Sequence, residues 1–156
     1  MGQNDLSRDH ISEHKAYSMT KVISWLDRGG DINVTSFNSR GLTILQMACF
    51  EDDAKLVAEL CARGADVNLK AGGKTALMHC AVVGSPACGK LLLEYGADPH
   101  MRADVDDTDF TQYDGMTAQE MLEQEIAQFG MRPRHRALLV ALQQYAGAPP
   151  PSVGPR

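Results

Sequence analysis

A short acidic stretch, Asp-Val-Asp-Asp-Thr-Asp at residues 104–109, has the residue types of a calcium-binding loop. Asp104, Asp106 and Thr108 alternate as the first ligands of such a loop do. Position six, however, holds Asp109 where a calcium loop needs glycine, and position twelve holds Gly115 where it needs glutamate. We therefore favour a solvent-exposed acidic loop. A charged contact surface and an ion-binding loop remain as alternatives.

The four cysteines, Cys49, Cys61, Cys80 and Cys88, could bind a metal or act as nucleophiles. Their spacing contains no close pair of the kind that binds zinc, so packing in the core is favoured. We expect Cys49 and Cys80 to be buried and slow toward thiol reagents. Cys88 is expected to lie one helical position off the core and to react first. Reduced thiols indicate a cytosolic or nuclear protein.

No other motif predicts chemistry. His10 and His14 lie four residues apart, but no third metal ligand is near, so an exposed pair is favoured over a metal site. The glycines before Lys74 lack the spacing of a phosphate-binding loop. We find no grouping of nucleophile, base and orienting residue. The sequence therefore predicts no catalytic residue, no cofactor, no metal and no enzyme; chemistry at His79, Cys80 or the acidic loop is the least favoured alternative.

An internal repeat predicts the elements that position these residues. Residues 43–68 and 75–100 match at a constant offset of 32. The matched pairs are Thr43 with Thr75, Leu45 with Leu77, Leu60 with Leu92, Gly64 with Gly96, and Asp66 with Asp98. A fixed period of this length is typical of stacked-repeat proteins.

Both stretches resemble the ankyrin repeat, whose pattern opens with Gly-x-Thr-Pro-Leu-His-x-Ala-Ala and closes with Gly-Ala-Asp-x-Asn. The openings are Gly41-x-Thr43 and Gly73-x-Thr75, and the closings are Gly64-Ala-Asp-Val-Asn68 and Gly96-Ala-Asp98. Ile44 and Ala76 replace the proline of the pattern, and Gln46 and Met78 replace its histidine. The resemblance implies an all-α fold, an ankyrin-repeat solenoid of about four stacked helix-turn-helix repeats with degenerate end caps.

Helix boundaries follow from particular residues. Thr43 with Gln46, and Thr117 with Glu120, have the spacing of a capping box at a helix start. Gly64 should take the left-handed conformation that ends a helix, and Gly96 should do the same one repeat later.

The end repeats are less regular, as a solenoid requires where no neighbour covers its outer face. Residues 12–33 are interpreted as a degenerate first repeat, with Val22, Trp25 and Leu26 in core positions. A fourth repeat starts at Thr117 after an insertion of about ten residues. Its apolar stripe is Met121, Leu122, Ile126 and Phe129, and a last helix from Pro133 is expected to bury Leu138, Leu139, Leu142 and Tyr145.

The expected organisation is a flexible N-terminus at 1–11, an ankyrin repeat domain at 12–147 and a disordered proline-rich tail at 148–156. The basic run Arg132, Arg134, His135 and Arg136 is interpreted as a solvated face or as a partner of the acidic loop.

Charge and hydropathy exclude some partners. The net charge of −5 argues against a nucleic-acid partner, and no apolar run has the length of a membrane span. We expect a monomer in the cytoplasm, with the nucleus as a further location.

The resemblance implies a non-enzymatic protein–protein interaction module, an adaptor or regulator that binds a partner protein through its concave groove and finger loops. A regulatory subunit of an enzyme or transcription-factor complex is the alternative. Exposed apolar residues in the groove favour a contact site. The predicted partner-binding residues are Leu42, Phe50, Glu51, Lys74, Met78, His79, Val82, Val83 and Met116.

Overall fold

The computed structural model describes residues 19–35, 41–104 and 111–147. Its α-helices are α2 (Met19–Asp27), α3 (Ile44–Phe50), α4 (Ala54–Ala62), α5 (Ala76–Val83), α6 (Pro86–Glu94), α7 (Ala118–Phe129) and α8 (Pro133–Ala146). A short 3-10 helix, η1 (Thr111–Tyr113), precedes α7. In these ranges the only extended pairing is one isolated bridge between Ala71 and Lys74.

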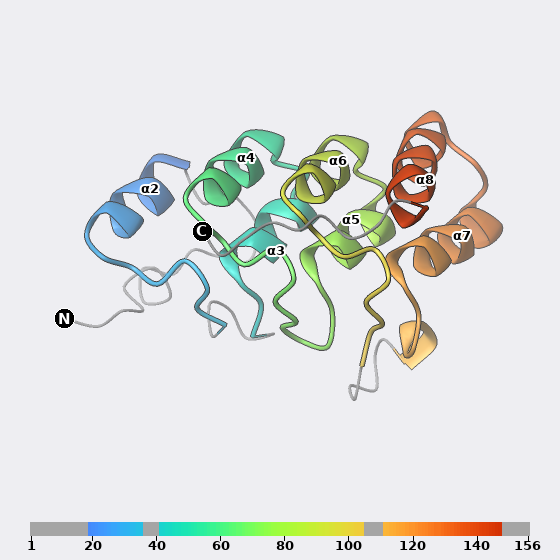
Figure 1. The fold of residues 1–156 in the computed structure, drawn as a ribbon, viewed down its shortest axis with the longest axis horizontal. Coiled ribbons are helices and arrows are strands. Elements are labelled where there is room, and N and C mark those ends of the chain that lie inside the picture. The colour runs from blue at the N-terminus through green and yellow to red at the C-terminus, as the bar shows by residue number, and fades with distance from the viewer. Residues whose placement is uncertain (1–18, 36–40, 105–110, 148–156) are drawn as a thin grey trace.

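The helices stack in two layers (Figure 1). α3, α5 and α7 pack side by side in one layer, and α4, α6 and α8 form the other. Each repeat is one helix from each layer, joined by a short turn. α2 is the second helix of the first repeat, whose expected first helix lies outside the described residues. The predicted all-α repeat solenoid is therefore confirmed.

Local signals place the helix ends as the sequence predicts. Thr43 Oγ1 accepts the Gln46 N–H at 3.1 Å, and Gln46 Oε1 accepts the Thr43 N–H at 3.1 Å. Thr117 and Glu120 form the same capping box at the start of α7. Gly64 follows α4 with a φ of +90°, a conformation that favours glycine because other residues place a Cβ against the backbone.

Asparagine side chains link consecutive repeats. Asn33 Oδ1 accepts the Asp66 N–H at 2.9 Å, and Asn68 Oδ1 accepts the Asp98 N–H at 2.7 Å. The next equivalent position holds His100 instead of asparagine. Each link satisfies a backbone donor that the turn would otherwise leave without a partner.

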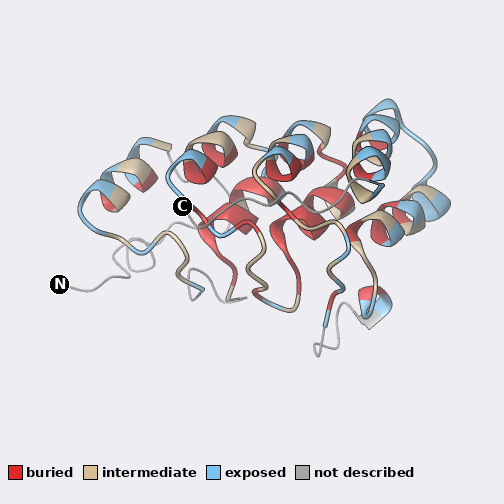
Figure 2. Cartoon of the chain, viewed as in Figure 1, coloured by how far each residue is buried: buried red, intermediate tan, exposed pale blue. Residues whose placement is uncertain are grey.

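The core runs between the two layers, and α3 and α5 are almost wholly buried (Figure 2). Val22 and Trp25 are buried as predicted. The predicted apolar stripe of α7 is wrong at Phe129, which is 58% exposed. No further repeat covers this corner within the described residues, so the side chain has nothing to pack against. Leu138 and Leu142 are buried as expected, whereas Leu139 and Tyr145 are only partly buried.

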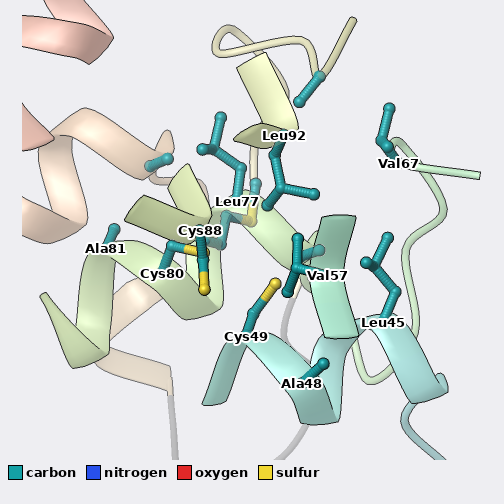
Figure 3. Close-up of a cluster of buried hydrophobic side chains, with 14 of the residues drawn as sticks. Leu45, Ala48, Cys49, Val57, Val67, Leu77, Cys80, Ala81, Cys88 and Leu92 are labelled. Carbon is teal, nitrogen blue, oxygen red and sulfur yellow. The ribbon is translucent and has the colours of Figure 1, made fainter. Parts of the chain in front are cut away.

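All four cysteines are free and buried. The expectation that Cys88 is the exposed and reactive thiol is wrong, because its side chain is 0% exposed. Cys49 on α3, Cys80 on α5 and Cys88 on α6 lie close together (Figure 3). A hydrogen bond links Cys49 to Cys80 across the interface of two repeats, and another links Cys80 to Cys88 within one repeat. The bond to Cys80 and burial raise the pKa of Cys88, and burial raises the pKa of Cys61 to about 11. Thiols held neutral in this way are poor nucleophiles.

Several predictions fall outside the described residues: the flexible N-terminus 1–11, the His10–His14 pair, the acidic loop beyond Asp104 and the tail 148–156. Among the described residues, no cluster of three or more histidine, cysteine or acidic side chains could hold a metal ion. None of the described helices combines the length and hydropathy needed to cross a bilayer.

Candidate interaction surface

Two edges border the layer of α3, α5 and α7. The finger edge comprises the connectors that precede these helices, at residues 69–74, 101–104 and 111–116. The turn edge comprises the turns that follow them, at residues 51–53, 84–85 and 130–132, together with the adjoining helix ends. Predicted contact residues lie at both edges, but their exposure to solvent differs between the two.

At the finger edge, one amide fastens two repeats together. Gln46 Nε2 donates to the carbonyl oxygen of Lys74 at 2.6 Å and to that of Ala71 at 3.3 Å. Gln46 is 1% exposed and also closes the capping box at Thr43. A residue expected only to cap its own helix therefore also holds the next finger in place.

The inserted connector adds a second fastening. Tyr113 is 3% exposed, and its hydroxyl donates a hydrogen bond to the carboxylate of Glu125 on α7, which is itself 8% exposed. Burial and this hydrogen bond raise the pKa of Tyr113 to about 12, because both favour the neutral phenol over the phenolate. Lys74 Nζ lies 5.7 Å from the centre of the Tyr113 ring, within the range of a cation–π contact.

The base of the insertion is closed by backbone hydrogen bonds. The Ala103 N–H donates to the Met116 carbonyl oxygen and the Gly115 N–H to that of Ala103, both at 2.9 Å. Asp104 N–H donates to the carbonyl oxygen of Gly73 on the preceding finger at 3.0 Å. Hydrogen bonds therefore hold the two ends of the inserted connector to each other and to the preceding connector, residues 69–74.

Four of the predicted contact residues are buried: Leu42, Lys74, Met78 and His79 are between 1% and 7% exposed. Lys74 is covered because Tyr113 folds over it. Met78 is buried because its sulfur takes the capping position, where it accepts the Thr75 N–H at 3.4 Å. Leu42 directly precedes Thr43, the N-cap of α3, in the region where Gln46 binds the next connector. His79 lies on α5, where every residue from Ala76 to Ala81 is buried.

The helix ends at the turn edge are more exposed, although Gly84 and Ser85 in its middle turn are buried. Phe50 is 45% exposed at the end of α3, and Glu51 follows it as an exposed residue. One repeat further along, Val82 and Val83 are partly exposed. Met116, the remaining predicted contact, is partly exposed at the finger edge. The structure thus leaves five of the nine predicted residues accessible, and four of these adjoin the same row of turns.

Consecutive turns at this edge touch one another. Asp52 adopts a φ of +57°, and its carboxylate accepts hydrogen bonds from the Ser85 hydroxyl and, at 3.8 Å, from the Cys88 thiol. A Cβ added at Gly84 would lie 2.8 Å from the ring of His135 and 3.7 Å from Cδ of Arg134. The turn of each repeat is therefore seated against the start of the second helix in the next.

The sequence did not predict the Tyr113–Glu125 pair or the burial of His135. His135 is 5% exposed and its Nδ1 accepts the Arg132 N–H at 3.4 Å, so the basic run is not one solvated face. The exposed arginines of that run have no acidic partner within 4.0 Å among the described residues. Glu125 lies three residues after Leu122 and so shares its face of α7. That spacing was the sequence signal that could have predicted its burial.

Comparison with known families agrees with this architecture. Residues 12–103 match the model for ankyrin repeats in three copies, which is more than half of the chain. The chain belongs to the ankyrin repeat family. Ankyrin repeats generally mediate protein–protein interaction and are generally not enzymatic. The matched segment ends before α7, so the fourth ankyrin repeat rests on the helix pair α7–α8 and its capping box.

Two curated proteins are similar to part of the chain. An E3 ubiquitin-protein ligase, Ufd4 of Drosophila melanogaster, is 38% identical over 73 residues, which is 47% of this chain and 3% of that protein. A putative ankyrin repeat-containing protein of Treponema pallidum is 37% identical over 67 residues, which is 42% of this chain and 22% of that protein. The chain therefore spans less than a quarter of the length of either relative.

Proposed function

We propose that this ankyrin repeat protein is an adaptor or regulator that binds one partner protein, with Phe50 as the central contact. Glu51, Val82, Val83 and Met116 complete the contact surface. The observation that supports this most directly is the 45% exposure of Phe50 at the end of α3, a helix whose other residues are buried or partly buried. An exposed aromatic residue next to partly exposed valines is typical of a contact site.

The geometry supports a contact at the turn edge better than one at the finger tips. Lys74 and Leu42 are already covered by the protein's own residues, so a partner would have to displace Tyr113 to reach Lys74. Phe50 needs no such rearrangement. A rigid surface that needs no rearrangement loses little free energy to ordering on binding.

Affinity capture from the source cells, with quantification of each bound protein, tests the proposal. Phe50→Ala and, separately, Val83→Glu should each lose the partner that the wild-type chain captures. Neither should change the midpoint of thermal unfolding much, since both side chains are exposed or half-exposed. If Phe50→Ala captures the same proteins in the same amounts, the contact is not at this residue.

A matched control separates a specific contact from non-specific binding by exposed apolar side chains. Val140 is 47% exposed on α8, a comparable apolar side chain away from the turn edge. Val140→Ala should leave capture unchanged. Equal losses for Phe50→Ala and Val140→Ala would show that capture depends on exposed apolar area in general.

The alternative role, as a regulatory subunit, differs in what the partner does. Adding the purified chain to its captured partner should change the partner's activity if the chain is a regulator, and should leave it unchanged if the chain is an adaptor.

Four free thiols fit a reducing compartment, so we propose that the protein lies in the cytoplasm or the nucleus.

A further inference from the structure

Charge is distributed unevenly along the turn edge. At the first turn, Glu51, Asp52 and Asp53 are followed by Lys55, which gives residues 51–55 a net charge of −2. The middle turn, at residues 84–85, is uncharged. At the last turn, residues 130–136 contain three arginines and no acidic residue, a net charge of +3. One row of touching turns therefore runs from acidic to basic.

Some of these charges oppose the preferences of their own helices, although Asp53 suits its helix because it caps the N-terminus of α4 and accepts the Leu56 N–H. Glu51 caps the C-terminus of α3, where the helix dipole favours a cation. Arg132 caps the N-terminus of α8 and Arg134 lies in its first turn, where the dipole favours an anion. Local helix stability therefore does not explain either placement, whereas an interaction with another surface does.

Exposed apolar side chains accompany the charges at both ends. The exposed large hydrophobic residues of the described chain are Phe50, Phe129, Met131 and Val140. Phe50 adjoins the acidic turn, and Phe129 and Met131 adjoin the basic turn. Val82 and Val83, which are partly exposed, lie at the uncharged middle.

We propose that the turn edge binds the turn edge of a second copy of this chain, in a two-fold symmetric dimer. A two-fold axis near Val83 would align one row with the other in reverse order. The acidic turn of each copy would then face the basic turn of its partner, and Phe50 would face Phe129 and Met131. Such an isologous contact needs a self-complementary surface, which an acidic–neutral–basic row provides.

This inference goes beyond the proposed function and does not depend on it, because it concerns the purified chain alone. It differs from the monomer that we expected from the sequence. A dimer of this kind would cover Phe50, so a partner protein and the second copy would compete for the same edge.

Sedimentation velocity on the full chain tests the dimer. At low salt, the wild type should sediment with twice the chain mass of 17.0 kDa at high concentration and dissociate on dilution. Added salt should weaken the association, because exposed ion pairs are screened. A wild-type chain that stays monomeric at every concentration and salt level would overturn the proposal.

Charge reversal identifies the face. Glu51→Arg places two like-charged pairs in the dimer, and so does Arg134→Glu, so each should weaken self-association roughly tenfold or more. Mixing the two variants restores both pairs, and an equimolar mixture should dimerise again. If the single variants still dimerise, or if the mixture does not, the contact lies elsewhere.

Two controls test whether the variants are folded and whether net charge alone decides self-association. Circular dichroism should show that each variant is folded, which is expected because both changes suit their helix dipoles. Glu94→Arg on α6 reverses an exposed charge away from the turn edge and should leave self-association unchanged. A loss of dimer with Glu94→Arg would show that net charge, not this face, decides association.

Discussion

At the finger edge, polar groups are buried and paired: the Gln46 amide reaches two carbonyl oxygens of the next finger, and Tyr113 reaches Glu125. At the turn edge, Asp52 accepts a hydrogen bond from Ser85, but Glu51 and Arg134 are exposed and have no ion-pair partner within the part of the chain that the structure describes. Both edges belong to the same inner helices. At the finger edge, Gln46 binds the connector of the next repeat, and Tyr113 of the inserted connector covers Lys74.

The difference separates stability from recognition. A buried hydrogen bond at the finger edge stabilises the fold, since its loss leaves a buried group without a partner. An exposed charge at the turn edge contributes little to folding. Substitutions at the first edge should therefore change the free energy of unfolding, and those at the second should change association.

The largest expected contrast is between two aromatic residues. Tyr113→Ala removes a buried ring and leaves Glu125 without its donor, so we expect a loss of about 3–5 kcal/mol in the free energy of unfolding. Phe50→Ala should change it by no more than about 0.5 kcal/mol, because the ring is exposed. Chemical denaturation measures both. Similar losses for the two variants would remove the distinction between the edges.

A smaller contrast concerns polar residues. Gln46→Ala should cost about 1–3 kcal/mol, since the Thr43 N–H loses its acceptor and the carbonyl oxygens of Ala71 and Lys74 each lose one of two donors. Glu51→Ala should fall within about 0.5 kcal/mol of the wild type. The same denaturation experiment gives both values. A Gln46→Ala chain as stable as the wild type would mean that water replaces the amide at no cost.

The Tyr113 phenol also predicts a pH dependence. Its pKa is raised from 10.0 to about 12, so the folded state holds the proton more tightly than the unfolded state. The stability from this group is fully present below the lower value and is lost as pH rises through the higher one. Unfolding curves of wild type and Tyr113→Phe should show a steeper loss over this range for the wild type. Parallel curves would contradict the prediction.

The smallest expected effect is a gain. Glu51→Arg and Arg134→Glu each replace a charge that the helix dipole disfavours, so each should raise the free energy of unfolding by about 0.3–1 kcal/mol. The measurement belongs at low protein concentration, where dimer formation does not stabilise the wild type. A clear loss of stability would show that these side chains support the fold.

The sequence by itself determined the repeat register and most helix boundaries. Capping pairs such as Thr43 with Gln46, and a helix-ending glycine such as Gly64, act through neighbours a few residues away, so spacing is enough to recognise them. The period of 32 likewise identified Leu60 and Leu92 as equivalent, and both are 0% exposed.

Only the tertiary structure decided which residues of the candidate surface are accessible. The register placed Lys74 and Phe50 on one face, yet Lys74 is covered by Tyr113, a residue 39 positions further along the chain. Cys88 was likewise expected to be exposed, but the repeat before it supplies its cover at Asp52. Burial depends on what packs from distant parts of the chain, and a repeat pattern carries no information about an insertion that folds back on it.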